Sequence, residues 1–580
     1  MTVQYSGGYF LHNENLVRGV GGSGHTATDM TQISNYTVNA VNYVQETAWT
    51  VNGQILNILD QFLDRKMDII HDGEVVLRLD EPINPATTSA LQDLWFDPEV
   101  WDEMSPDDKK ANKQAKQIIH EDYKSQLGEA RSARRILSTA REMWEFDKFY
   151  FPHNMDFRTR IYPIPSDLTP QSSDLAKGLL RFAKPTRLGS EGVYWMGFTV
   201  ATHFGEDKLH PDERMEWAVE NLALIGSWVD DPMKNRGWLK ADKPFQFLAV
   251  AYEWVFAWRL GDPEDFMSHL PGNLDGSCNG AQHLSVMACD LVGAKATNCM
   301  TGPREDLYME VADRVWEQIQ IDAANDDPMA LKWSAKMSDP SKRRKVVKRS
   351  VMTVPYGVTA RGVADFMIAD KHVEPGPDKW DQAKYMRDLI LEAVDKTLNR
   401  GKALQAWFME CAALCAENNL PLCWDTPAGS KVTQAYRNLI SKRITSFDTR
   451  FLVYMEPDEG EEEVDFLRRV GIDKGKMATA APPNVVHSCD ASHLQITVNR
   501  MHDIGIRDFS MIHDSFGCPF AHVGTMRDIL RQSMVDMYDD DYLAVWKESV
   551  ERYSGLTMPD APELGLFNVQ DILKSEFFFS

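Results

Sequence analysis

The sequence predicts an α-rich α+β protein, and three patterns support this class. Apolar residues recur at helical spacing from Tyr36 to Leu63, and helical patterns also run from about residue 303 to 419. The apolar run at Phe509–Ile512 predicts a short strand that leads into a tight turn, and residues around Pro427–Gly429 have the pattern of a β-hairpin. We therefore expect many helices and small sheets.

The amino-terminal part predicts two long helices separated by a solvated crossing. Residues 1–35 are a leader whose first thirty positions are Gly-rich and aperiodic, and one amphipathic helix should cover 36–63. From Leu79 to about Ala111 the chain is acidic and interrupted by prolines, and a Lys/Arg-rich helix should then run from about 112 to 146. These two helices could form a projecting antiparallel pair.

The most apolar stretch, FQFLAVAYEWVFAW from Phe245, is too short to cross a membrane and contains Glu253. We expect a buried helix there. The N-terminus does not have the pattern of a secretory signal. The sequence thus favours a cytoplasmic protein without a membrane partner.

The composition limits the possible partners and cofactors. With 62 Lys and Arg against 86 Asp and Glu, the 580 residues carry a net charge of −24, which argues against a general nucleic-acid coat protein. An apolar content of 43% excludes global disorder. The eight cysteines form no C-x-x-C pair and indicate reduced thiols; Cys411, Cys415 and Cys423 could be metal ligands, but core packing is favoured.

Two charge blocks have opposite signs. Lys342–Arg349 contains six cations in eight positions, and Glu456–Asp465 contains seven acids in ten. An acidic run is most often a solvated face, and we favour that interpretation for the second block. The basic block differs because of the residues that follow it.

Arg344, Lys348, Met352 and Tyr356 recur every four residues and therefore share one helix face. Such a face is often only solvated surface. Here the tyrosine lies next to Gly357, which can end the helix. Two cations followed by an aromatic ring suit a nucleoside triphosphate, with Arg344 and Lys348 on the phosphates and the ring near the sugar or base.

Two other segments supply carboxylates for divalent metal. Asp275 precedes Gly276, whose carbonyl can approach an ion, and Asp514 lies between His513 and Ser515 after the predicted strand. Two such carboxylates could hold two Mg²⁺ ions, which activate an attacking hydroxyl and stabilise a leaving oxygen.

Together and in this order, DGSCNGAQH, RKVVKRSVMTVPYG and IHDSFG resemble motifs of the single-subunit, phage-type DNA-dependent RNA polymerases, which include the mitochondrial enzyme. NMDFRTRIYP, SSDLAKGLL, NVVHSCDASHL and QDILKSEFFFS resemble further segments of that family, from roughly residue 36 to 580. The resemblance implies a right-hand polymerase fold of thumb, palm and fingers with a small antiparallel palm sheet. It implies a leader at 1–35, thumb-like helices at 36–147, palm at 148–185, a palm insertion at 186–262, palm with the first aspartate at 263–292, fingers at 293–486 and palm with the second aspartate and the C-terminal tail at 487–580.

The resemblance also implies roles for single residues in adding ribonucleoside monophosphates to an RNA 3′ end on a DNA template. Asp275 and Asp514, helped by the Gly276 carbonyl, would bind two Mg²⁺. Lys348 would protonate the pyrophosphate, because an ammonium group gives up a proton more readily than guanidinium. The substrate-binding residues would be Arg344, Lys348, Tyr356, His487 at the ribose 2′-OH, and Tyr308; the nucleic-acid-binding residues would be Arg158, Arg160, Lys177, Arg349 and His513. The alternative for Arg158, Arg160 and Lys177 is ordinary salt bridging within the protein.

The sequence departs from the family pattern at four places. Pro355 precedes Tyr356 and should kink the helix or end it one turn early. Thr159 stands where the family usually has Gly. We expect no counterpart of the family's amino-terminal promoter-binding domain, and we expect a loop at 440–480, which contains the acidic block, in place of the promoter-reading hairpin. We therefore expect an enzyme that works on single-stranded or pre-opened DNA, or with an accessory protein, in the cytoplasm of a phage-infected bacterium.

The motifs leave three alternative functions open. An A-family DNA polymerase shares several motif residues, but DGSCNGAQH lacks that family's glutamate and HDS replaces its HDE. A primase making short RNA would fit the missing promoter domain, although no zinc module accompanies the core. A catalytically inactive binding subunit is disfavoured by Asp275, Lys348 and Asp514.

Overall fold

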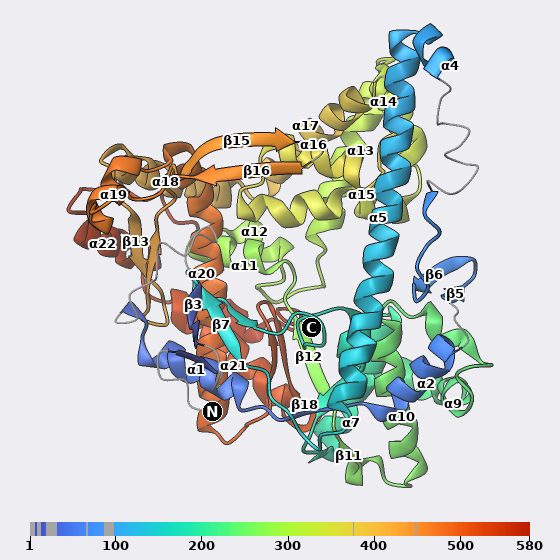
Figure 1. Cartoon of the computed structure of the whole chain (residues 1–580). Coiled ribbons are helices and arrows are strands. Elements are labelled where there is room, and N and C mark those ends of the chain that lie inside the picture. Colours follow the sequence, from blue (N-terminus) through green and yellow to red (C-terminus); the bar gives the residue numbers. More distant parts are fainter. Residues whose placement is uncertain are drawn as a thin grey trace.

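The computed structural model describes residues 6–8, 13–18, 32–64, 68–85, 98–374, 376, 378–446 and 449–580. Helices dominate, and each sheet in this part of the chain has two or three strands (Figure 1). The predicted α-rich α+β class is confirmed.

The helix expected over 36–63 is wrong, because a strand divides it. The three elements are α1 (Asn35–Gln45), β4 (Trp49–Val51) and α2 (Gly53–Asp64). Strand β4 pairs with β9 (Leu180–Phe182), and β-branched residues at Thr50 and Val51 suit a strand. A long-range pairing thus overrides the helical spacing.

Part of the leader belongs to a sheet. Strand β3 (Val17–Arg18) pairs in parallel with β7 (His153–Asp156), and Leu16 and Val17 are buried. The other strands here are β1 (Ser6–Gly8) with β2 (Asn13–Asn15), and β8 (Ile161–Pro163), which pairs with β7.

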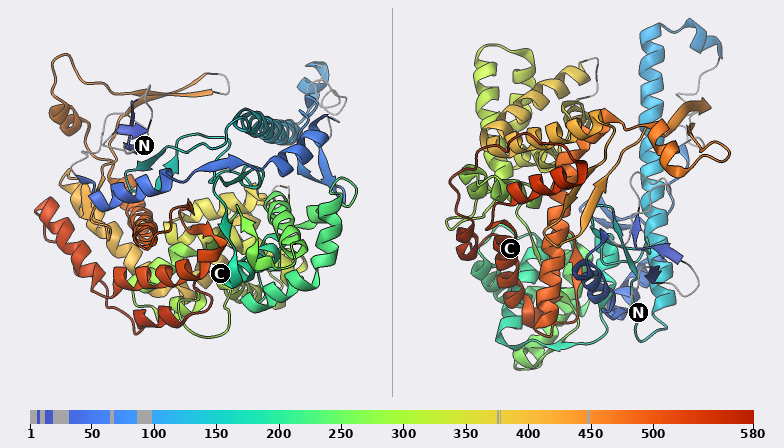
Figure 2. Two further views of the ribbon diagram at one scale, coloured as in Figure 1. Left: turned by 90° about the horizontal axis from the view of Figure 1, so that it is seen from below. Right: turned by 90° about the vertical axis from the view of Figure 1, so that its left-hand side faces the viewer.

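The Lys/Arg-rich helix is α5 (Pro106–Met143), which begins at the Ser105 cap and stands out from the body (Figures 1 and 2). The antiparallel pair expected for it is wrong, since α2 lies only at its base (Figure 1). Near α5 lie α4 (Pro98–Glu103), at its far end, and the hairpin of β5 (Ile69–His71) with β6 (Glu74–Leu77).

A small antiparallel sheet forms the centre of the molecule, as predicted. Its strand order is β12 (Pro271–Asp275), β18 (Ser515–Pro519) and β17 (Ser510–Ile512), and the tight turn at residues 513–514 joins the last two in sequence. The adjoining helices are α6 (Asp174–Gly178), α7 (Gly189–Phe204), α20 (Lys474–Asp503) and α21 (Val523–Tyr538).

The segment between α6 and β12 is mainly helical. The apolar stretch from Phe245 lies in α10 (Pro244–Arg259), whose inner face and Glu253 are buried, as predicted. Among the described residues, no helix is both long and apolar enough to traverse a bilayer. The other elements are α8 (Pro211–Glu220), α9 (Leu222–Asp230), η4 (Arg236–Lys240), η5 (Pro263–Asp265), and the pair β10 (Thr186–Arg187) with β11 (Met267–Ser268).

The predicted helical region at 303–419 is confirmed, and much of it packs around a core of its own. Helix α15 (Pro340–Thr353) carries the basic block and continues as the 3-10 turn η6 (Val354–Tyr356). The neighbouring helices are α11 (Asn279–Met287), α12 (Leu291–Ala296), α13 (Leu307–Ala324), α14 (Pro328–Met337), α16 (Ala360–Ala369), α17 (Lys379–Thr397) and α18 (Asn399–Glu417).

Two hairpins follow. The predicted one is formed by β13 (Leu422–Asp425) and β14 (Lys431–Gln434). The second, β15 (Ile440–Ser446) with β16 (Thr449–Tyr454), extends away from the helices (Figure 2). It corrects the expectation of a loop over 440–480, since the acidic block follows the hairpin and leads into α19 (Glu463–Val470).

The C-terminal segment returns to the central sheet. After α22 (Tyr542–Ser554) and η8 (Val569–Lys574), Phe579 bridges Gly276 and the Ser580 N–H donates to the Asp275 carbonyl at 3.3 Å. The chain end therefore supports the end of β12.

All eight cysteines are free thiols. Cys411, Cys415 and Cys423 are buried, and burial raises the pKa of each thiol. These buried, protonated thiols agree with the prediction that the three cysteines pack in the core and do not bind a metal.

Candidate active site

The central sheet brings Asp275 and Asp514 together. Asp275 ends β12 directly opposite Ser515 of β18, and the Gly276 N–H donates to the Asp514 carbonyl at 3.3 Å. His513 adopts a left-handed conformation with φ of +46°, which sharpens the turn before Asp514. The two predicted metal ligands are thus neighbours despite their distance in sequence.

The two carboxylates form an anionic site that suits a divalent cation. Burial, followed by the charge of Asp275, raises the pKa of Asp514, so a nearby cation would relieve the repulsion between them. No cluster of three or more His, Cys, Asp or Glu side chains suited to a metal occurs among the described residues. Mg²⁺ commonly uses one or two protein carboxylates together with substrate phosphates, and the pair fits that mode.

Glycine is needed at position 276. A Cβ there would lie 2.9 Å from the Gln282 side-chain oxygen and 3.2 Å from the Phe579 ring. The Gly276 carbonyl, which we expected to face an ion, accepts a hydrogen bond from the Cys278 N–H at 3.0 Å. A carbonyl oxygen has two lone pairs, so one remains for a second partner.

Two lysines flank the carboxylates. Lys243 Nζ lies 3.8 Å from Asp275 Oδ2. Burial and then Lys243 lower the pKa of Lys177, while Asp275 and Asp514 act in the opposite direction. Lys177 was expected on the nucleic-acid backbone, and the structure places its charge near the carboxylates. Sequence reasoning missed Lys243, since nothing local marks it beyond its place before Pro244.

Arg344, Lys348 and Met352 lie on α15 as predicted, whereas Tyr356 follows in η6, and the two cations differ in their contacts. Arg344 Nε donates to Asp306 Oδ2 at 2.8 Å, and its guanidinium lies over the Tyr308 ring at 5.0 Å. Lys348 is exposed and makes no ion pair or hydrogen bond with another described residue. The structure therefore joins Arg344 to Tyr308 and leaves Lys348 available to a ligand.

Tyr356 and His487 lie together. Their ring centroids are 4.5 Å apart, and a Cβ on Gly280 would lie 2.6 Å from the Tyr356 ring, so this ring packs closely on α11. The expected effect of Pro355 is confirmed, because α15 ends at Thr353 and Tyr356 occupies a 3-10 turn closed by Gly357 with φ of +70°.

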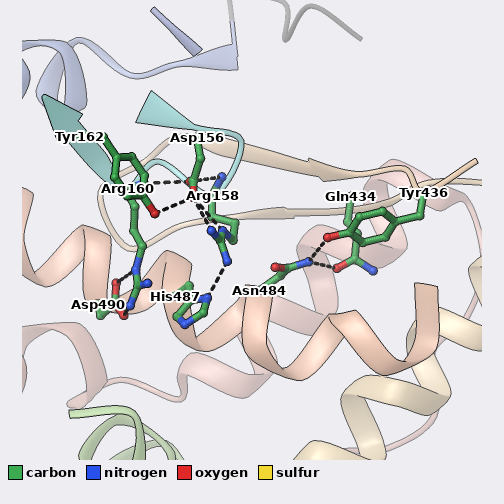
Figure 3. A network of polar contacts seen from close by, with 9 residues as sticks. All are labelled: Asp156, Arg158, Arg160, Tyr162, Gln434, Tyr436, Asn484, His487 and Asp490. Carbon is green, nitrogen blue, oxygen red and sulfur yellow. Dashed lines mark hydrogen bonds and ion pairs between the residues drawn. The ribbon is translucent and has the colours of Figure 1, made fainter. Parts of the chain in front are cut away.

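The turn between β7 and β8 presents two arginines toward α20 (Figure 3). Arg160 Nε donates to Oδ1 of the fully buried Asp490 at 2.9 Å. Burial alone would lower the pKa of Arg160, but Asp490 raises it, so we take the pair as ionised. Arg158 binds Asp156 and His487. Both guanidinium groups thus have protein partners instead of the free position expected for contacts with a nucleic-acid backbone.

Thr159 lies in the same turn with φ of +70°, a conformation that glycine adopts without strain. Its buried hydroxyl makes no hydrogen bond within the described structure. A glycine at this position would remove both the backbone strain and the unpaired hydroxyl.

The remaining two residues predicted to contact nucleic acid, His513 and Arg349, lie in different parts of the structure. His513 meets the edge of the Tyr162 ring at 4.7 Å, and burial lowers its pKa to about 3, which keeps it neutral. Arg349 lies elsewhere, since it pairs with Asp370 at 2.5 Å and stacks on Phe366 of α16.

Comparison with known proteins gives consistent matches. A family model described as DNA-dependent RNA polymerase matches residues 186–555. The chain is 32% identical over 560 residues to DNA-directed RNA polymerase 2, chloroplastic/mitochondrial, of Arabidopsis thaliana, covering 93% of this chain and 52% of that protein. It is 33% identical over 556 residues to DNA-directed RNA polymerase 3B, chloroplastic, of Nicotiana tabacum, covering 93% and 53%. The chain thus spans about half the length of these relatives.

Proposed function

This chain belongs to the DNA-dependent RNA polymerase family, and on that premise we propose that it adds ribonucleoside monophosphates to an RNA 3′ end on a DNA template. The observation that carries the proposal is the meeting of Asp275 and Asp514 at one end of the central sheet, with Lys177 and Lys243 beside them. A substrate with several phosphates and a divalent cation suits this mixture of charges.

Each group has a distinct task in this proposal. Asp275 and Asp514 would hold two Mg²⁺, which when bound supply positive charge to the reacting oxygens. Arg344 exchanges Asp306 for the triphosphate, and Lys348 binds the phosphates and gives a proton to the leaving pyrophosphate. Tyr356 and His487 contact the ribose, and their proximity supports a shared role in selecting ribonucleotides.

We also propose that the enzyme uses single-stranded or pre-opened DNA, or receives opened DNA from an accessory protein. The acidic block lies next to the β15–β16 hairpin, and Asp458 and Glu459 are exposed. Exposed carboxylates repel DNA phosphates, so they oppose close contact with duplex DNA at this place.

The proposal is tested with single-stranded DNA circles and with linear duplexes that carry or lack a short opened bubble. Long RNA on circles and bubbles, with none on closed duplex, supports it. Specific initiation by this chain alone on closed duplex would contradict the need for opened DNA, and only short RNA on circles would indicate a primase.

A further inference from the structure

Arg158 is held in one orientation by Asp156 (Figure 3). Its Nε and Nη2 donate to Asp156 Oδ2 at 2.9 and 2.5 Å, and its backbone N–H donates to Asp156 Oδ1 at 2.9 Å. Tyr162 Oη donates to the same carboxylate at 3.2 Å. Because guanidinium is a rigid planar fork, fixing Nε and Nη2 also fixes the direction of Nη1.

The Nη1 atom of Arg158 lies 2.7 Å from Nδ1 of His487. Guanidinium has donors and no acceptor, so Nδ1 must accept this hydrogen bond with its lone pair. A neutral imidazole then carries its hydrogen on Nε2. That atom makes no hydrogen bond to another described residue, and its N–H is available to a ligand.

The groups around the ring oppose a second proton. Burial, then Arg160, Arg158 and His513, lower the pKa of His487. Tyr356 faces the ring and stays protonated, because burial raises the pKa of its hydroxyl. Asp156 and Asp490, the nearby carboxylates, are already paired with Arg158 and Arg160. His487 is therefore a neutral imidazole with one defined donor.

The backbone of His487 is fixed as well. One turn earlier on α20, Asn484 Nδ2 donates to Gln434 Oε1 at 2.8 Å and to Tyr436 Oη at 3.2 Å (Figure 3). These bonds tie α20 to β14, so the helix and the β7–β8 turn hold His487 from two sides.

We propose that Arg158 is a positioning residue for ribose selection, which fixes His487 as the Nε2–H tautomer so that the imidazole donates to the 2′-hydroxyl oxygen of the incoming nucleotide. This deepens the proposed function and rests on it for the identity of the ligand. It gives Arg158 a role different from the backbone contact expected from sequence.

The tautomer is measured directly by NMR on the full chain with ¹⁵N-labelled histidine, and His487→Gln assigns the signals. Wild type should show an unprotonated Nδ1 and a protonated Nε2. Arg158→Leu should give a mixture of tautomers, while the matched control Arg18→Leu should keep the wild-type signals. Arg18 lies on neighbouring β3 and stacks on Tyr162 at 4.6 Å without contacting His487.

Primer extension with matched ribo- and deoxynucleotides supplies the second readout. In Arg158→Leu, discrimination should fall about five- to tenfold, the loss of one hydrogen bond, through a higher KM for the ribonucleotide. The KM for the deoxynucleotide should not change. If Arg158→Leu does not fold, Arg158→Lys serves instead, because a single ammonium nitrogen cannot bind Asp156 and reach His487 together.

A protonated Nδ1 in wild type, or an unchanged tautomer in the folded variant, would overturn the proposal. If Arg158→Leu alters the tautomer of His487 but discriminates between ribo- and deoxynucleotides as wild type does, Arg158 has no role in ribose selection. If wild type extends no primer, the proposed function fails, and the NMR signals still decide whether Arg158 fixes His487.

Discussion

The Gly276 N–H donates to the Asp514 carbonyl at 3.3 Å, which ties the end of β12 to the turn between β17 and β18. This bond keeps the side chains of Asp275 and Asp514 close enough for the first charge to raise the pKa of the second. The site thus keeps two carboxylates together although they repel each other, and this cost to the folded state is expected where a cation binds.

Asp514→Asn should abolish nucleotide addition without destabilising the protein. Activity should fall by at least about a hundredfold, because a ligand for the metal is lost. The melting temperature should stay the same or rise, since burial and Asp275 both disfavour the charge that the variant removes. Rapid-quench extension and calorimetry measure the two effects. Asp265→Asn, an exposed carboxylate that pairs with Arg187, is the control and should remain active.

Lys348 should contribute both charge and a proton. Lys348→Met should reduce kcat by about a hundredfold or more, the usual contribution of a general acid. Lys348→Arg should keep KM near the wild-type value and still lower kcat, because guanidinium scarcely gives up a proton. Lys345→Met, an exposed residue on the same helix, should be near wild type in single-turnover kinetics. If Lys345→Met and Lys348→Met lower kcat equally, the total positive charge of α15 supports the reaction and Lys348 has no specific role as an acid.

Tyr356→Phe should relax the choice between ribo- and deoxynucleotides and keep chain extension. The hydroxyl lies beside Gly280 and the ring beside His487, so the variant retains the ring packing and loses only the hydroxyl that would contact the ribose. Competition between a ribonucleotide and its deoxy form measures the change, which should be about tenfold. Tyr385→Phe, whose hydroxyl bonds Asp322 away from this site, should keep the wild-type preference.

Glu253 should make stability depend on pH. Burial raises its pKa from 4.5 to about 7, although Ser268 and the His269 N–H donate to it. Because the folded pKa exceeds the unfolded value, its stabilisation is complete below about pH 4.5 and is lost as pH rises through 7. The loss is up to roughly 3 kcal/mol at 1.36 kcal/mol per pKa unit. Glu253→Gln should make the melting temperature nearly independent of pH between pH 5 and 8. If the melting temperature of the variant depends on pH as strongly as that of wild type, Glu253 is not the group responsible.

Local sequence signals predicted much of the site. The placement of Arg344 and Lys348 on one helix depends only on helical periodicity, and Pro355 acts on its own neighbours by ending that helix before Tyr356. The apolar run before His513 likewise specifies a strand and turn within one segment. These features appear in the structure because no distant contact opposes them.

Long-range contacts set the features that the sequence did not reveal. Strand β4 interrupts the helical pattern because it pairs with β9, more than a hundred residues later. Asp490 meets Arg160, and Lys243 meets Asp275, only after the chain has folded. Residue spacing carries no information about such pairs, so the sequence does not identify the carboxylate partners of Arg158 and Arg160.

Nucleotide addition at the Asp275–Asp514 site is measured by extension of an RNA primer annealed to a DNA template, with Mg²⁺ and either ribo- or deoxynucleotides. Wild type should add ribonucleotides as the template directs and strongly prefer them to deoxynucleotides, and Asp514→Asn should add none. Absence of extension by folded wild type, or full activity of Asp514→Asn, would contradict nucleotide addition at this site.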